Sequence, residues 1–421
     1  MTAYPKMTAE ERKAEYAEVT REYEELKARG LNLNMARGKP GKAQLDLVSD
    51  IFSLMQKPED YVSDGVDVRN YGELSGLPAA KRLFAEILGC RPEQVFVGGN
   101  ASLQLMYDTI SKAYTHGLLH SERPWCREPV VKFLCPAPGY DRHFKVTESF
   151  GFELVTIPMT DEGPDMDAVE KAIQDPAVKG MWNVPKYSNP DGIIYSAETI
   201  RRIASMKPAA PDFLLMWDNA YCIHEFEGDY VEFPDILAEC EKYGNADMVF
   251  EFASTSKVTL PGAGISCFAC SEAYMEKLLT VQVISFDKVN QQRHVLYLKD
   301  KAHTLELMKK HAAIMGPKFR CVVDALDREI APLEIASWRR PKGGYFVSLN
   351  AMPGTAKRTL ALCKEAGVTM TGAGATFPYG KDPQDSNIRI APSLPPVEEL
   401  EQAIAVLCVC LKMAALEKLG V

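Results

Sequence analysis

Short apolar runs alternate with segments of helical period through the middle of the chain. The runs that predict buried β-strands lie at residues 94–97, 130–135, 152–157, 181–184, 213–217, 247–252 and 265–270. Between them, apolar residues recur at helical spacing, as at Leu103, Met106 and Ile110. Strands that alternate with helices predict βαβ crossovers and a largely parallel sheet. We therefore expect an α/β domain in the middle of the chain.

The C-terminal part follows a different pattern. Its predicted elements are a strand ending at Leu349, a helix over 355–366, a strand over 387–393 and a closing helix over 397–415. These elements are typical of a small α+β unit. Upstream, helical period runs from 272 to about 286, breaks over 286–294, and resumes near 296 in a long helix that leads into this unit. Because 421 residues exceed one ordinary hydrophobic core, we expect two domains.

Composition and charge exclude several classes of protein. Apolar residues make up 46% and charged residues 25% of the chain, which is typical of soluble globular proteins. The net charge of −9 argues against nucleic-acid binding, and no apolar run is long enough to span a bilayer. The first segment mixes acidic and basic residues, unlike a signal peptide, so the 11 cysteines indicate reduced thiols and a cytoplasmic protein. Cys267 and Cys270 have CxxC spacing but no second pair, which argues against a metal site.

One lysine stands just after a predicted strand, among small hydroxylated residues. Lys257 ends the run Ser254-Thr-Ser-Lys and is followed, from Pro261, by Pro-Gly-Ala-Gly. A lysine at the edge of a sheet has a flexible stem, and its amine loses a proton readily when buried. This is the property that a lysine needs to form an imine with a carbonyl compound. A single lysine in a loop is more often exposed to solvent than reactive. The interpretation of Lys257 therefore depends on the other segments.

Polar residues also follow other predicted strands, at the edge where ligands bind in open α/β sheets. Two glycines lead into Asn100-Ala101-Ser102, which opens a helix. The unpaired N–H groups of that helix start can bind phosphate, although Asn100 or Ser102 can also simply cap it. Tyr140 follows a rigid Pro-Ala-Pro-Gly turn, and we interpret the nearby His143 as structural rather than as a general base.

Three more positions are candidates for hydrogen bonding or charge pairing. Asn189, in an Asn-Pro-Asp-Gly turn, either donates a hydrogen bond to a ligand or only shapes the turn. Asp218 ends an apolar strand, where a buried carboxylate needs a partner, and Tyr221 follows close enough to face the same pocket. Arg389 lies among apolar neighbours, and a guanidinium holds a carboxylate with two parallel bonds, which lysine cannot do. The simpler alternatives are an Asx turn at Asp218 and an outward-facing arginine.

Taken in order, these segments resemble the fold-type I pyridoxal-phosphate enzymes, specifically the class I aminotransferases. The ordered set that carries the resemblance is Tyr71, Asn100-Ala101-Ser102, Tyr140, Asn189-Pro190, Asp218 with Tyr221, Ser254-x-x-Lys257 and Arg389. The surrounding residues are similar to a divergent aspartate aminotransferase branch related to the catalytic domain of MocR-type regulators. The resemblance implies a mostly parallel seven-stranded sheet sandwiched by helices in a large domain over 49–317. It also implies a smaller α+β domain over 318–421, which the N-terminal segment 1–48 joins.

The resemblance implies a role for each of these residues in binding pyridoxal 5′-phosphate. Lys257 would form an imine with the cofactor and then act as the general base, and Asp218 would pair with the pyridinium nitrogen. Tyr221 and Asn189 would hydrogen-bond the phenolic oxygen, while Tyr140 would stack on the ring. The phosphate would be bound by Ala101, Ser102, Ser254, Ser256 and Tyr71 of the partner subunit, which implies a homodimer with shared active sites.

The resemblance also implies how substrate binds, with two departures from the family pattern. Arg389 would bind the substrate α-carboxylate, assisted by the backbone of Gly38 and by Asn189. The arginine that usually follows the lysine and holds phosphate is absent, because residues 261–265 read Pro-Gly-Ala-Gly-Ile. Helix and backbone donors, or another cation, must then meet the phosphate charge. For the distal carboxylate of a dicarboxylic substrate, we favour Lys288 over Arg293.

We therefore expect an aminotransferase that converts L-aspartate and 2-oxoglutarate to oxaloacetate and L-glutamate by a ping-pong mechanism. The nearest alternative is another enzyme of the same fold, either an aromatic or broad-specificity aminotransferase or a C–S lyase. A non-catalytic sensing module that keeps the fold and an unrelated nucleotide-binding α/β enzyme are alternatives from other classes. The expected partners are amino-acid and 2-oxo-acid substrates and a second copy of the chain, without nucleic acid or membrane.

Overall fold

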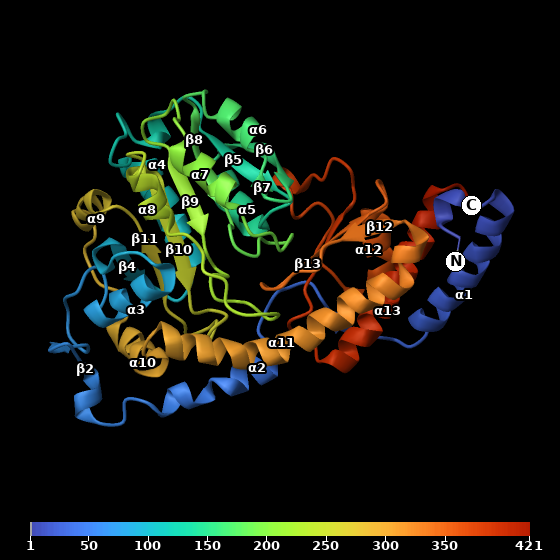
Figure 1. Ribbon diagram of the computed structural model, residues 1–421, viewed down its shortest axis with the longest axis horizontal. Helices are drawn as coiled ribbons and strands as arrows, with labels where there is room; N and C mark the ends of the chain where they lie inside the picture. The colour runs from blue at the N-terminus through green and yellow to red at the C-terminus, as the bar shows by residue number, and fades with distance from the viewer. Residues whose placement is uncertain (1) are drawn as a thin grey trace.

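The computed structural model describes residues 2–421, and a sheet of eight strands lies at the centre of its larger part (Figure 1). From edge to edge the strands are β4 (Val95–Gly98), β11 (Ser266–Ala269), β10 (Val249–Ser254), β9 (Leu214–Asp218), β8 (Val178–Asn183), β5 (Lys132–Ala137), β6 (Glu153–Thr160) and β7 (Gly163–Pro164). The strands from β10 to β6 are parallel, whereas β11 is antiparallel to both neighbours and β7 to β6. The predicted mostly parallel sheet is confirmed. The strand beyond the predicted seven is β7, whose two residues are too few to give an apolar run.

Helices cover both faces of this sheet, as expected (Figure 1). One layer holds α3 (Pro78–Leu88), α6 (Met166–Ala172), α7 (Ala197–Ser205), α8 (Ile236–Glu241) and α10 (Lys288–Leu298). The other holds α4 (Ser102–His116), α5 (Asp141–Ser149) and α9 (Glu272–Leu279). Successive strand residues point to opposite faces, so Val95 and Val97 pack in the first core while Phe96 packs in the second.

The helices after β11 begin and end at different residues than the apolar pattern indicates. The pattern predicts a helix from 272 to about 286 and a break over 286–294, whereas α9 ends at Leu279 and α10 begins at Lys288. Asp287 explains the shift, because its side chain accepts a hydrogen bond from the Asn290 N–H and caps α10. Asp300 caps the next helix, α11 (Lys301–Glu329), in the same way.

A smaller unit is built from the two ends of the chain. It contains the antiparallel strands β12 (Ala336–Trp338), β13 (Val347–Ala351) and β15 (Asn387–Ile390), with α12 (Ala356–Glu365) and α13 (Val397–Lys418). The N-terminal helix α1 (Ala9–Lys27) lies along α13, and β1 (Leu33–Asn34) pairs in parallel with β14 (Val368–Thr369) (Figure 1). This packing supports joining residues 1–48 to the C-terminal part, although the domain limits stay a prediction. The predicted limit at 317 falls inside α11, which runs without interruption from one unit to the other.

The segment between β1 and α3 contains short elements. They include α2 (Lys42–Leu47), which lies against α11, and the hairpin of β2 (Val62–Ser63) and β3 (Val66–Asp67). Across residues 2–421, none of the helices has both the length and the apolar character that crossing a membrane requires.

Candidate active site

A cavity of about 570 Å³ lies between the strand ends of the large sheet and the small unit. The large sheet contributes the segments that follow β5, β8, β9 and β10, together with the start of α4. The small unit contributes Phe346, Arg389 and the loop from Ala36 to Lys39. All but two of the predicted site residues line this cavity: Gly38, Ala101, Ser102, Tyr140, Asn189, Asp218, Tyr221, Ser254, Ser256, Lys257 and Arg389.

Lys257 enters the cavity from a tight turn after β10. The Thr255 carbonyl accepts hydrogen bonds from the N–H groups of Val258 and Thr259, and the Thr255 hydroxyl accepts one from Ile265. The Lys257 ammonium then lies 4.9 Å from the centre of the Tyr221 ring and 5.5 Å from that of Tyr345. Burial lowers the pKa of Lys257, and the charge of Asp218 opposes this only in part. The site therefore makes this amine easier to deprotonate, as a nucleophilic lysine requires.

Asp218, the last residue of β9, lines the cavity and has one unpaired carboxylate oxygen. Its Oδ2 lies 2.9 Å from His143 Nε2, while the buried Oδ1 has no hydrogen-bond partner in residues 2–421. His143 is itself fixed, because its ring stacks on Trp182 at 4.3 Å between centroids. A buried carboxylate oxygen without a partner is costly, so Oδ1 is suited to accept a hydrogen bond from a bound group.

The sequence indicates a structural role for His143, and its contact with Asp218 makes it part of the site. It lies on the first turn of α5, next to Tyr140, whose ring centroid is 4.8 Å away. The three-residue spacing from Tyr140 was the available signal, since residues three apart share a helix face. The carboxylate 75 residues further along could not be assigned from that spacing.

Two tyrosines that line the cavity, Tyr140 and Tyr221, keep their hydroxyl protons at neutral pH. Burial raises the pKa of Tyr140 to about 12 and raises that of Tyr221 well above its ordinary value. Tyr221 is held in place by stacking on Tyr345, with ring centroids 6.1 Å apart. Both hydroxyls can therefore donate hydrogen bonds at neutral pH.

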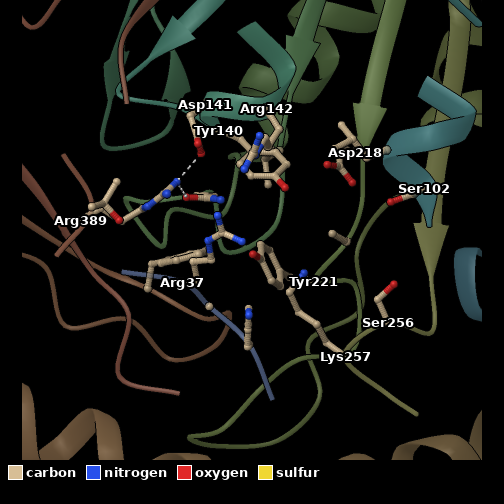
Figure 2. A pocket seen from close by; sticks show the side chains of 18 of the residues that line it. Arg37, Ser102, Tyr140, Asp141, Arg142, Asp218, Tyr221, Ser256, Lys257 and Arg389 are labelled. Atoms are coloured by element: carbon tan, nitrogen blue, oxygen red, sulfur yellow. Dashed lines mark hydrogen bonds and ion pairs between the residues drawn. The ribbon is translucent and has the colours of Figure 1, made fainter. Parts of the chain in front are cut away.

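A cradle of donors lies at the end of the cavity away from Arg389 (Figure 2). The start of α4 has no side-chain cap, so the alternative in which Asn100 or Ser102 caps it is not observed. Its free N–H groups and positive dipole end lie beside hydroxyls from the Lys257 turn. Ser254 and Ser256 have their hydroxyl oxygens 3.1 Å apart, and Ser256 also donates to the Asn100 carbonyl. Such a cradle suits an anion of phosphate type.

Arg389 lies at the opposite end, on β15, with only 7% of its surface exposed. Its Nη1 donates to Asp141 Oδ1 at 2.8 Å and to Asn189 Oδ1 at 3.3 Å, while the buried Nε has no partner in residues 2–421. The Phe346 ring packs against the guanidinium at 4.9 Å. These contacts hold one edge of the guanidinium and leave Nε available for a carboxylate.

Asp141 belongs to the site and was not singled out from the sequence. It lies beside Tyr140 at the start of α5, but the arginine that it pairs with is 248 residues away. No local pattern could reveal this pair. The arginines Arg37 and Arg142 also line the cavity, and the sequence pattern gives no signal that they do.

Two predicted site residues lie outside this cavity in the single chain. Tyr71 is 85% exposed, so its expected phosphate contact would have to be made in a partner subunit. Lys288, at the start of α10, is only 6% exposed, and its ammonium donates to the Ser285 hydroxyl at 2.9 Å. Its rival Arg293 is half-buried and lies 3.5 Å from Asn290 Oδ1. The roles assigned to Tyr71 and Lys288 stay predictions.

Comparison with known proteins agrees with this geometry. A family model described as "Aspartate amino-transferase" matches residues 7–421. An aspartate aminotransferase of Corynebacterium glutamicum is 45% identical over 406 residues, which are 96% of this chain and 94% of that protein. The crystal structure of an aspartate transaminase from the same species has a TM-score of 0.97 at 43% identity and covers 99% of both chains.

A more distant solved structure shares the fold alone. An α-aminoadipate aminotransferase of Thermus thermophilus, crystallised with N-(5′-phosphopyridoxyl)-L-leucine, is 21% identical with a TM-score of 0.73. The similarity covers 93% of this chain and 95% of that one. The family match and the 45% identity both extend over nearly the whole chain, and together they establish its family. The chain belongs to the aspartate aminotransferase family and is an aminotransferase.

Proposed function

We propose that this protein transfers the amino group of L-aspartate to 2-oxoglutarate with pyridoxal 5′-phosphate and a ping-pong mechanism. The observation that carries the proposal is the convergence of Lys257, Asp218 and Arg389, from three separate strands or strand ends, on one cavity. The aspartate aminotransferase of C. glutamicum, with which this chain shares 45% identity, supports the choice of substrate.

The cavity fits the cofactor at three places. The Lys257 amine, whose pKa burial lowers, suits the aldehyde, and the cradle around Ser102 and Ser256 suits the phosphate. The unpaired Asp218 Oδ1 suits a protonated ring nitrogen. When bound, pyridoxal phosphate supplies an electron-accepting ring that stabilises negative charge at the substrate Cα.

Each of the other steps would then be carried out by a side chain of this protein. Asp218 would keep the ring nitrogen protonated, with His143 holding its other oxygen at 2.9 Å. Lys257 would carry the proton from the substrate Cα as general base. Tyr221 and Asn189 would hydrogen-bond the phenolic oxygen, and Arg389 would hold the substrate α-carboxylate through its free edge.

We further propose that the working unit is a homodimer with shared sites. Tyr71 and the apolar side chains of Leu74, Val283 and Ile284 are exposed on the single chain, which leaves apolar surface for a second copy. The cytoplasm is the proposed compartment, since all the cysteines in the described chain are free thiols.

The test is to mix the cofactor-loaded enzyme with single amino acids and follow its absorbance. Aspartate and glutamate should convert it to the pyridoxamine form with release of the matching 2-oxo acid. Lys257→Ala should lose both the absorbance of the bound aldehyde and this half-reaction. Ammonia and a 2-oxo acid formed without any acceptor would instead indicate a lyase, and cofactor binding without conversion would indicate a sensing module.

A further inference from the structure

The cavity as a whole carries more positive charge than its lining carboxylates neutralise. Within residues 2–421 the acidic side chains that line it are Asp141 and Asp218. Asp141 pairs with Arg389, and Asp218 is bonded to His143. The other arginines of the lining, Arg37 and Arg142, have no ion pair in the described part of the chain. An α-carboxylate needs only the guanidinium of Arg389, so a second anionic group of the substrate can be accommodated.

Arg37 lies on a loop whose backbone is fixed at both ends. Met35 donates its N–H to the Thr369 carbonyl at 2.9 Å and accepts from the N–H of Ala391 at 3.2 Å. The Thr371 hydroxyl donates to the Ala36 carbonyl at 2.7 Å, and the Ser393 hydroxyl donates to the Lys39 carbonyl at 2.8 Å. These bonds tie the loop to the segment after β14 and to the end of β15, which carries Arg389. The Cα of Arg37 is therefore held at a fixed place relative to Arg389.

The side chain of Arg37 points into the cavity between Arg389 and Tyr221 (Figure 2). Arg142 instead lies beside Tyr140, next to the ring that is expected to cover the cofactor (Figure 2). A substrate whose α-carboxylate lies on Arg389 and whose Cα lies near Lys257 would extend its side chain past Arg37. The planar guanidinium can bind a second carboxylate with two parallel hydrogen bonds.

Lys288 is less suited to this task. Only 6% of it is exposed on its own chain, and its ammonium is already bonded to Ser285. Arg37 reaches the cavity of its own chain without any rearrangement.

We propose that Arg37 binds the distal carboxylate of the substrate, so that one chain recognises both carboxylates of a dicarboxylic amino acid. This inference rests on the proposed function and deepens it, since it assigns the group that selects acidic over neutral substrates. Arg37 replaces Lys288 in that role.

The experiment compares wild type with Arg37→Ala, Arg142→Ala and Lys288→Ala. The first measurement is kcat/KM of the half-reaction with aspartate and with alanine, which lacks the distal carboxylate. Arg37→Ala should lower the aspartate value about 100-fold and change the alanine value by about threefold or less. Arg142→Ala and Lys288→Ala should keep the wild-type ratio of aspartate to alanine. Arg37→Lys should recover part of kcat/KM for aspartate, because lysine restores the positive charge but cannot form the two parallel hydrogen bonds of a guanidinium.

The second measurement is calorimetric binding of succinate and butyrate, which differ in the second carboxylate. Arg37→Ala should weaken succinate binding and leave butyrate binding as in wild type. Two results would overturn the assignment of Arg37. One is an equal loss of kcat/KM for aspartate and for alanine in Arg37→Ala. The other is a loss of kcat/KM for aspartate alone in Lys288→Ala or Arg142→Ala. An enzyme that neither binds succinate nor converts aspartate overturns the proposed substrate and this inference together. Normal aspartate turnover in Arg37→Ala overturns the inference alone.

Discussion

Gly38 is the residue at which a single added carbon should disturb substrate binding. A Cβ built there would lie 2.6 Å from Cζ of Phe346, and the Phe346 ring packs at 4.9 Å against the Arg389 guanidinium. We predict that Gly38→Ala displaces this ring and raises KM for aspartate, lowering kcat/KM about tenfold. The affinity for the cofactor should not change, because Gly38 lies at the substrate end.

The matched control is Gly262→Ala, in the loop after Lys257. A Cβ there meets no atom within 4 Å, and Gly262 does not have a positive φ. Steady-state kinetics of both variants with aspartate check the prediction. Unchanged kinetics in Gly38→Ala would show that Phe346 can move without consequence for Arg389.

Glu251 makes the stability of the protein depend on pH. It is buried on β10, its Oε1 accepts a hydrogen bond from Asn219 at 2.8 Å, and its Oε2 has no partner in residues 2–421. Burial raises its pKa from 4.5 to about 8. The folded state therefore binds more protons than the unfolded state between these values, and stability falls as pH rises through this window.

We predict that Glu251→Gln removes this loss of stability. At pH 5 the carboxyl is largely neutral in the folded state, so Tm of the variant should lie near that of wild type. At pH 8 the variant should melt several degrees higher, because glutamine is neutral and keeps the acceptor for Asn219. Scanning calorimetry at both pH values checks this, and a Tm difference that is the same at pH 5 and pH 8 would contradict it.

At the scale of elements, the segments after β8 and β9 are joined by a buried ion pair. Lys186 is fully buried, and its Nζ lies 2.6 Å from Glu225 Oε1. The same ammonium donates to the carbonyls of Cys222 and Val231. One segment carries Asn189 and the other carries Tyr221, so the pair helps to hold two walls of the cavity.

We predict that Glu225→Gln destabilises the protein by about 3 kcal/mol, because it leaves the Lys186 charge buried without a counter-charge. The double variant Lys186→Met with Glu225→Leu should lose less than Glu225→Gln alone. Glu198→Gln is the control, since its pair with Arg201 is exposed on α7. Thermal unfolding of the three variants tests this, and an equal Tm for Glu225→Gln and Glu198→Gln would be inconsistent with it.

Elements with a long apolar signature could be predicted from the sequence, and elements set by single polar residues could not. The runs that became β5, β8 and β9 are buried on both faces, so their composition alone marks them. The start of α10 depends on one cap at Asp287, inside a stretch whose apolar period is weak. The same difference applies to the residues of the site. Asp218 ends β9 and Lys257 lies on the turn just after β10, whereas the pair of Arg389 and Asp141 joins the two units and has no local signature.

At the scale of the whole molecule, the active site lies between the two units, and we expect a second chain to complete it. Tyr71 is 85% exposed on the single chain, yet its expected partner is the phosphate. We predict that the Tyr71→Ala dimer and the Lys257→Ala dimer are each less active than wild type. A heterodimer with one chain of each variant should regain activity. The heterodimer then contains one cavity with an intact lysine and an intact tyrosine from the other chain.

Co-expression with two affinity tags isolates this heterodimer. The isolated heterodimer should have about half of the wild-type activity, since one of its two sites is complete, and the unseparated random mixture about a quarter. A mixture no more active than the sum of its parents would show that Tyr71 serves its own chain or no site at all.

We expect the Lys257 amine to react with the cofactor aldehyde in this cavity. The most direct measurement is to load the protein with pyridoxal 5′-phosphate, reduce it with borohydride, and locate the added mass by peptide mapping. We expect one phosphopyridoxyl group per chain, on Lys257, and we expect none when aspartate is added before the reductant. A modification on another lysine with Lys257 unmodified, or no modification, would contradict it.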